Sequence, residues 1–430
     1  MGSSPLNEEK VRYEVASGHR RVRRKERAPQ SYNDNMHKSN TLLRTRSWPR
    51  RKAKKTGPRR GEGVSSWSLR GGLPQRHSND RSNLLGGRHD MSTAVELARG
   101  GYGCVYRVFD EITKKHVALK LQIGQVMHAN FVREVRVLAY LRQFRNSNIV
   151  WLIGHFQYKQ ETLIRYYLTM ELLSTDLHRT MYAGSQFTIK TTRRIAKQIC
   201  DALAFLRQVE VVHCDLKPGN ILLCRAGWTW IKISDFRLSY MPAVHHKPKV
   251  VQTLGYRAPE VMLSQRRSYA IDMWSFGVIL TQMYTHSLPF RGWTELHSIR
   301  QMVAVLGMPS NDLLRSFGSA ERHFTLNKDG NYELVDVLDE ALENPKNLEE
   351  LIVQGGEQQD VNNELTEKRR QLCDLVRRIF VFDDIHRLTP DQALQHDFFS
   401  QYEDELQHLN VPIERCVEEC YWIETSMHWI

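Results

Sequence analysis

The stretch that decides the fold is His213-Cys214-Asp215-Leu216-Lys217-Pro218-Gly219-Asn220. It follows an amphipathic helical pattern at residues 191–208 and precedes an apolar strand pattern, so we expect a loop between a helix and a strand. Asp215 and Lys217 are candidate catalytic residues, because a carboxylate can accept a proton and an ammonium can place positive charge beside a phosphoryl group. Asn220 can bind a metal through its amide oxygen. A lone Asp-x-Lys is usually a surface turn, so the interpretation depends on the motifs around it.

A glycine-rich turn lies upstream, between two strand patterns. Gly100, Gly103 and Val105 match the frame Gly-x-Gly-x-x-Gly-x-Val, while Ala98 stands at the first glycine position. Glycines allow backbone N–H groups to approach phosphates closely, although such a turn alone is weak support. The pattern predicts a nucleotide-binding loop formed by Leu97, Ala98, Arg99, Gly100, Gly101, Tyr102, Gly103, Cys104 and Val105.

Three further patterns complete the expected nucleotide site. Lys120 ends the strand pattern 117–120 and can reach phosphates, and Glu134 in the helical pattern 131–138 can pair with it. Residues 168–173 predict a buried strand that leads into a hinge, where backbone groups would bind a nucleotide base. The residues predicted to contact the nucleotide are Ala118, Lys120, Glu134, Met170, Glu171, Leu173 and Leu222.

A second acidic motif, Asp235-Phe236-Arg237, follows another strand pattern. Asp235 lies 20 residues after Asp215, and its carboxylate is a group that can bind a metal ion, as the amide oxygen of Asn220 can. Two buried charges are expected further along, since an unpaired buried charge is costly. Glu260 is predicted to pair with Arg387, and Asp272, in an apolar helical pattern, to accept hydrogen bonds from backbone N–H groups of the 213–220 loop.

In this order, over residues 95–400, the motifs resemble the eukaryotic protein kinase catalytic domain. His-Cys-Asp-Leu-Lys-Pro, Tyr-Arg-Ala-Pro-Glu and Ile-Asp-Met-Trp-Ser are similar to the CMGC group, notably the dual-specificity tyrosine-regulated kinases. Gly307-Met308-Pro309, His323-Phe324 and residues 372–399 resemble the pre-mRNA-splicing branch of that family.

The resemblance implies an α+β bilobal fold, with a small β-rich N-lobe at residues 91–173 and a larger helical C-lobe at residues 174–400. Residues 401–430 would form a C-terminal extension. It also implies ATP and Mg²⁺ as cofactors and protein substrates that are phosphorylated on serine or threonine, with tyrosine left open. The Lys217-Pro218 pair resembles the serine/threonine type.

Two departures from the family pattern matter. Arg237 replaces a glycine, and we expect its side chain to point to solvent or to an acidic residue of the N-lobe helix, which leaves Asp235 available to Mg²⁺. If Arg237 instead pairs with Asp235 or Glu134, a pseudokinase scaffold becomes the alternative. Cys214 replaces an arginine that commonly binds an activation-loop phosphate, and residues 248–250 hold no tyrosine, so we expect basal activity without phosphorylation there. Tyr240 and Thr253 are left open as alternative phosphorylation sites.

Positive charge is concentrated at the beginning of the chain. Residues 1–90 hold 22 lysines and arginines against 8 acidic residues, whereas residues 91–430 hold 39 against 40. The first segment lacks apolar periodicity, so we expect a disordered basic tail. Its clusters at residues 20–25 and 50–55 could bind importins, acidic proteins or RNA, or could be solvated without a partner. A third interpretation makes the protein a nucleic-acid adaptor through this tail.

The scattered cysteines lie mostly among apolar or motif residues, which indicates reduced thiols and a nuclear or cytoplasmic location. No apolar run reaches the ~18 residues of a membrane span, and we expect no membrane contact. The sequence leaves the oligomeric state open.

Deleting residues 1–90 is expected to leave a folded, active domain and to move a fluorescent fusion from the nucleus to the cytoplasm, because both basic clusters are lost. Live-cell imaging of the full chain beside the deletion measures this shift. A full-length chain with both clusters changed to alanine controls for length, and an unchanged distribution would exclude a targeting signal.

Overall fold

The computed structural model describes residues 84–101, 103–122, 127–160, 163–184, 187–225, 229–243, 251–264, 267–335, 347–356 and 364–400. All of them belong to the unit that comprises residues 69–430. The predictions for the basic clusters, Tyr102, residues 248–250 and the C-terminal extension lie outside the described residues.

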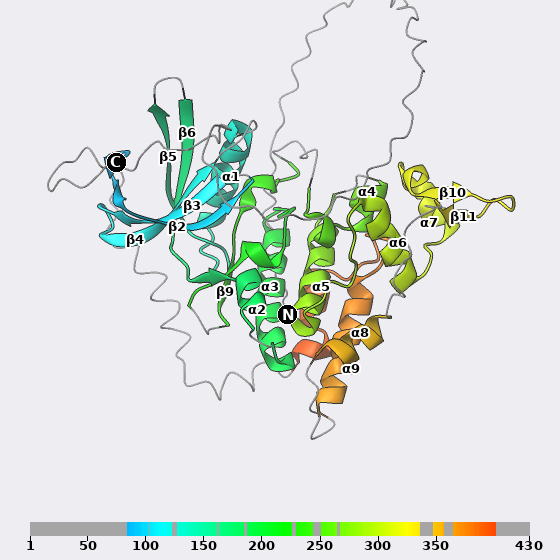
Figure 1. The fold of residues 1–430 in the computed structure, drawn as a ribbon. Helices are drawn as coiled ribbons and strands as arrows, with labels where there is room; N and C mark the ends of the chain where they lie inside the picture. Colours follow the sequence, from blue (N-terminus) through cyan, green and yellow to red (C-terminus); the bar gives the residue numbers. More distant parts are fainter. Residues whose placement is uncertain are drawn as a thin grey trace, which may run out of the picture. The chain divides into compact units, whose positions relative to one another are not determined.

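The first part of the domain is an antiparallel sheet with the strand order β1-β2-β3-β4-β6-β5 (Figure 1). Its strands are β1 (Leu84–Leu85), β2 (His89–Gly100), β3 (Gly103–Asp110), β4 (Lys115–Gln122), β5 (Leu152–Gln160) and β6 (Leu163–Met170). Helix α1 (Met127–Arg142) packs against β5 and β6. Because β1 and the start of β2 lie before residue 91, the deletion that tests targeting has to end at residue 83.

Strand alternation in β4 separates the core of the sheet from the functional face. Successive side chains of a strand point to opposite faces. Val117 and Leu119 therefore enter an apolar cluster with Val108 of β3. Ala118 and Lys120 face the other way and line a cavity. The buried apolar residues of β4 thus fix the position of Lys120, which is the only charged residue in the segment 117–120.

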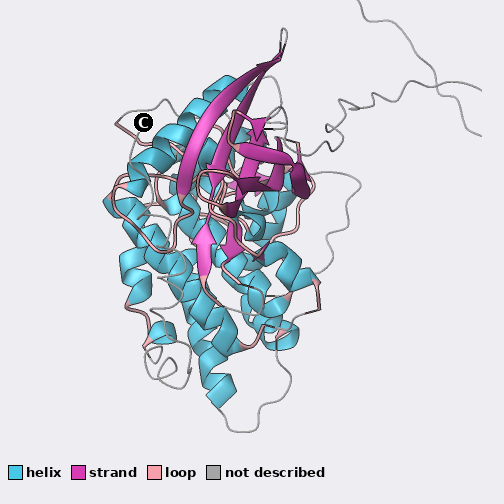
Figure 2. Ribbon diagram, turned by 90° about the vertical axis from the view of Figure 1, so that its left-hand side faces the viewer, coloured by secondary structure: helices cyan, strands magenta, loops and turns pink. Residues whose placement is uncertain are grey.

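The second part is mainly helical, as predicted, and in Figure 2 the strands lie in the upper part of the view while the lower part consists of helices and loops. Its helices are α2 (Leu177–Tyr182), α3 (Ile189–Gln208), α4 (Pro259–Leu263), α5 (Ala270–Thr285), α6 (Glu295–Leu306), α7 (Asn311–Ser316), α8 (Leu348–Gly355), α9 (Glu364–Ile379) and α10 (Pro390–Leu394). Small sheets pair β7 (Thr175–Asp176), β8 (Ile221–Leu223) and β9 (Ile231–Ile233), and β10 (Phe324–Leu326) with β11 (Tyr332–Leu334).

Short 3₁₀ turns carry several functional segments and are η2 (Pro218–Asn220), η3 (Phe236–Leu238), η4 (Leu254–Tyr256), η5 (Ala320–Arg322) and η6 (Asp397–Phe399). The observed α+β architecture, with a β-rich first part and a helical second part, confirms the predicted fold class.

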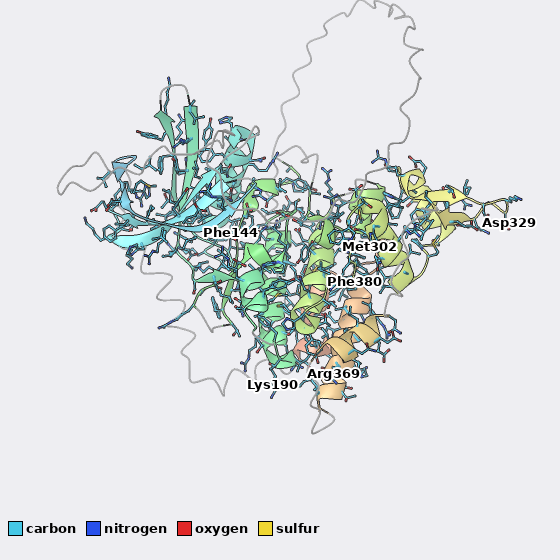
Figure 3. The ribbon with its side chains drawn as sticks, viewed as in Figure 1. Phe144, Lys190, Met302, Asp329, Arg369 and Phe380 are labelled. Atoms are coloured by element: carbon cyan, nitrogen blue, oxygen red, sulfur yellow. The ribbon has the colours of Figure 1, made fainter. Side chains whose placement is uncertain are left out.

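Helix α5 is buried along nearly its whole length because apolar residues surround it on every side. Its residue Gly277 permits the close approach of α9. A Cβ at this position would lie 2.7 Å from Ile379 Cγ2 and 2.9 Å from Phe380 Cε1. Phe380, labelled in Figure 3, makes a T-shaped contact with Phe290, and its ring centroid lies 5.1 Å from that of Trp274. This packing makes α5 the rigid centre of the helical part.

The predicted pair of Glu260 and Arg387 is confirmed as a buried, bidentate ion pair. Arg387 Nη1 lies 2.6 Å from Glu260 Oε1, Nη2 lies 2.8 Å from Oε2, and both side chains are fully shielded from solvent. The guanidinium also donates to the carbonyl groups of Ala270 and Val381 and lies over the Trp274 ring. It therefore joins α4, the start of α5 and the segment after α9.

Replacing Arg387 with leucine is expected to destabilise the domain by about 3–5 kcal/mol, because Glu260 is left as a buried charge without its partner. Chemical denaturation followed by circular dichroism measures the change. The double variant Arg387→Leu, Glu260→Leu should recover part of the loss, since no unpaired charge remains. Equal losses in the single and double variants would contradict this account.

Candidate active site

A cavity of about 540 Å³ lies beneath the β2–β3 turn. Most of the residues predicted from sequence line it, namely Leu97, Ala98, Arg99, Gly100, Gly101, Gly103, Val105, Ala118, Lys120, Met170, Glu171, Leu173, Lys217, Asn220, Leu222 and Asp235. Asp215 and Glu134 do not line the cavity. They contact Lys217 and Lys120, respectively, which do. The predicted residue Cys104 does not line the cavity: along β3, Gly103 and Val105 face it, and the side chain of the alternate residue Cys104 is buried.

The ammonium of Lys120 lies between two carboxylates. Its Nζ is 2.6 Å from Glu134 Oε1, which confirms the predicted pair, and 2.8 Å from Asp235 Oδ1. Gln122 Nε2 donates to the other oxygen of Glu134 at 2.5 Å. Burial disfavours the charged ammonium, but the carboxylates of Asp235 and Glu134 outweigh burial and raise the pKa of Lys120. Lys120 therefore stays charged and joins β4, α1 and the segment before η3.

The carboxylate of Asp215 is held on both oxygens. Its Oδ2 accepts from Lys217 Nζ at 3.0 Å, and its Oδ1 accepts from the backbone N–H and the hydroxyl of Thr253 at 3.1 and 2.9 Å. Asn220 Nδ2 donates to the carbonyl of Asp215 at 2.7 Å. These contacts bring together Asp215, Lys217 and Asn220, the three loop residues that the sequence singles out. They also orient the carboxylate of Asp215, which is almost fully buried.

Helix α5 fixes the shape of the 213–220 loop through Asp272. Its two carboxylate oxygens accept hydrogen bonds from the backbone N–H groups of His213 and Cys214 at 2.7 and 2.9 Å, as predicted. Cys214 takes a left-handed backbone conformation, with φ of 68°, which an L residue rarely adopts. The two hydrogen bonds to Asp272 hold this turn in place. Burial raises the pKa of Asp272, and its hydrogen bonds favour the charged form.

The hinge that follows β6 contains another buried ion pair. Glu171 accepts from Lys232 Nζ at 2.8 and 3.0 Å and from the backbone N–H of Trp151 at 2.7 Å. Its carboxylate is therefore committed to the protein, and the contact of the hinge backbone with a base stays a prediction. The pair also connects the hinge to β9, the strand that leads to Asp235.

Arg237 does not point to solvent, so that prediction is wrong. Its Nη1 lies 3.0 Å from Asp235 Oδ2, its Nη2 lies 3.5 Å from Asp215 Oδ2, and its side chain is 11% exposed. Two nearby carboxylates in a shielded site outweigh the hydration of an exposed guanidinium. Burial opposes ionisation of Asp235, but Lys120 and Arg237 outweigh it and lower the pKa of Asp235.

The backbone accommodates Arg237 without strain. Asp235, rather than Arg237, takes the left-handed conformation, with φ of 67°, and Arg237 belongs to the 3₁₀ turn η3. The Cβ of Arg237 therefore carries none of the cost that applies to a side chain at positive φ.

Several functional residues were missed from sequence. Arg179 of α2 lines the cavity and donates from Nη2 to the carbonyl of Leu97 at 2.7 Å, so it links the helical part to the glycine-rich turn. Asp176 lines the cavity and caps α2 by accepting from the N–H of Arg179. The signal for this pair is an Asp that precedes a short helical pattern just after the hinge. No local sequence pattern marks Thr253, because its contact with Asp215, which lies 38 residues away in the chain, depends on the tertiary structure.

Comparison with known proteins identifies this arrangement. The family description "Protein kinase domain" matches residues 91–399. The chain belongs to the protein kinase family. It is 28% identical over 318 residues to the "Putative dual specificity tyrosine-phosphorylation-regulated kinase 3 homolog" of Drosophila melanogaster. This alignment covers 70% of the chain and 37% of that relative, so the chain spans well under half of the relative's length.

The similarity agrees with the predicted CMGC resemblance, because dual-specificity tyrosine-regulated kinases belong to that group. The pre-mRNA-splicing branch stays a prediction.

Across the described ranges, none of the kinase's helices combines the length and the hydrophobicity that a bilayer crossing requires.

Changing Thr253 to valine is expected to lower kcat by roughly 10–100-fold, because hydrogen bonds to charged groups contribute about 1.5–3 kcal/mol. The hydroxyl orients Asp215 and Lys217, so nucleotide affinity should stay unchanged. Steady-state kinetics and nucleotide binding measure the two effects. The matched variant Thr253→Ser keeps the hydroxyl and should retain most activity, and equal loss in both variants would contradict this role.

Proposed function

We propose that this kinase transfers the terminal phosphoryl group of ATP to serine or threonine hydroxyls of protein substrates, with tyrosine left open. The observation that carries the proposal is the convergence of two networks on one cavity. Glu134, Lys120 and Asp235 form the first network, and Asp215, Lys217 and Thr253 form the second.

In this proposal, the glycine-rich turn covers the phosphates of ATP and Lys120 binds them through its ammonium. Asp215 orients the acceptor hydroxyl and takes its proton as the new bond forms. Lys217, which contacts the same carboxylate, stabilises the charge of the transferring phosphoryl group. The hinge backbone after Met170 binds the base, and Leu222 contacts its face.

The kinase fold implies Mg²⁺, and we propose Asn220 and Asp235 as its ligands, since an amide and a carboxylate oxygen are donors that this ion prefers. When bound, the ion would neutralise phosphate charge. In the structure, Lys120 contacts Asp235 Oδ1 and Arg237 contacts Asp235 Oδ2. The contact with Arg237 has to open before Oδ2 can become a metal ligand.

A pseudokinase scaffold is the second candidate function, and the pair of Arg237 with Asp235 is the observation that favours it. The assembled set of Lys120, Glu134, Asp215 and Lys217 favours the enzyme, because a scaffold does not require a positioned base beside an ammonium. A nuclear or cytoplasmic location and a tail partner, such as importin, an acidic protein or RNA, stay proposals.

Changing Asp215 to asparagine is expected to abolish phosphoryl transfer and to leave ATP affinity within about threefold of wild type, because Asp215 faces the acceptor hydroxyl rather than the nucleotide. Phosphate incorporation into a basic protein and into proline-containing peptides measures transfer, and a fluorescent ATP analogue measures binding. The exposed substitution Asp312→Asn is the matched control. Equal losses of binding and transfer would overturn the assigned role, and an inert wild-type protein would support the scaffold.

A further inference from the structure

Six charged side chains form a chain of alternating sign across the active site. Each link is an ion pair, with separations of 2.6, 2.8, 3.0, 3.5 and 3.0 Å. In order, the side chains are Glu134, Lys120, Asp235, Arg237, Asp215 and Lys217. Arg237 is the link that joins the nucleotide-facing half of the chain to the catalytic half.

The charge balance of this chain depends on Arg237. The three carboxylates carry three negative charges, and Lys120 and Lys217 carry two positive charges. Without Arg237 the other five side chains of this chain would carry one excess negative charge, whereas with Arg237 the six are neutral together. The excess would repel the phosphates of a nucleotide, because charges interact strongly where water is largely excluded. A bound metal ion normally offsets such an excess in phosphoryl-transfer sites.

The guanidinium is held where a compensating cation is needed. It lines the cavity together with Lys120, Lys217 and Asp235. Phe236 is fully buried and anchors the turn, and Arg133 Nη1 approaches the carbonyl of Arg237 at 3.5 Å. The turn is thus fixed on its apolar side and on its backbone. Because a guanidinium keeps its charge at every accessible pH, this positive charge is a permanent part of the site.

We propose that Arg237 is the resident cation of the nucleotide site and that the cleft binds nucleoside triphosphates without a metal ion. The inference rests on the nucleotide cavity of the proposed function but does not require phosphoryl transfer. Arg237 shares the carboxylates of Asp235 and Asp215 with Lys120 and Lys217, so neither lysine is the sole counter-charge of its carboxylate when phosphates bind. A metal ion then adds little to affinity, because it has to displace a cation that is already there.

Fluorescent-ATP titrations of the full-length protein, in excess EDTA and in excess Mg²⁺, test this inference. The variants are Arg237→Ala, which suits the right-handed turn, Arg237→Lys, which keeps the charge, and the exposed control Arg315→Ala. For wild type and the control, the two Kd values should agree within about threefold. In Arg237→Ala, the metal-free Kd should rise at least tenfold, or about 1.4 kcal/mol, while the Kd in Mg²⁺ stays within about threefold. Arg237→Lys should fall between these results.

The outcomes separate this inference from the proposed function. Wild-type binding that requires Mg²⁺ would overturn the inference and leave the proposed kinase intact. Metal-free binding by a protein that transfers no phosphate would support the inference and contradict the proposed function. Failure to bind ATP under either condition would contradict both. If Arg237→Ala does not fold, as judged by circular dichroism, the wild-type ratio and Arg237→Lys still decide the question.

Discussion

The contact of one ammonium group with two carboxylates organises this kinase. Lys120 Nζ touches Glu134 of α1 and Asp235 before η3, so β4, the neighbouring helix and the catalytic part of the chain meet at a single atom. A buried ammonium is tolerated only where anions compensate for its lost hydration. Each carboxylate has one further donor, Gln122 for Glu134 and Arg237 for Asp235, so Lys120 is the group that the two share. The site is assembled when the two parts of the domain are correctly placed, and not otherwise.

The apolar core prepares this contact from both sides. Alternation in β4 buries Val117 and Leu119 and leaves Lys120 facing the cavity. On the other side, α5 is buried nearly throughout, and the carboxylate of Asp272 accepts hydrogen bonds from two backbone N–H groups of the 213–220 loop. Hydrophobic burial thus sets the positions, and a few buried charges select one loop conformation among those that the packing permits.

Much of the site could be predicted because its charges lie inside apolar patterns. Glu260, Asp272 and Lys120 each had to find a partner within a buried element, and the partner could be named from motif order. Cys104 is predicted to belong to the nucleotide-binding loop, and in the structure its side chain is buried and does not line the cavity. Arg237 and Thr253 could not be placed from sequence. The direction of Arg237 depends on a charge balance over residues from four separate segments, and Thr253 meets Asp215 only through the return of the chain.

The burial of Cys214 has a chemical consequence for the catalytic loop. A thiol attacks electrophiles and is oxidised as its thiolate, and burial together with the nearby carboxylate of Asp272 raises the pKa of Cys214 well above that of an exposed thiol. Burial also raises the pKa of the Cys200 thiol. A sulfur atom one residue from the proposed catalytic base is thereby kept unreactive toward peroxide and alkylating agents. The loop gains a compact apolar side chain at its tightest turn without acquiring a redox-sensitive centre.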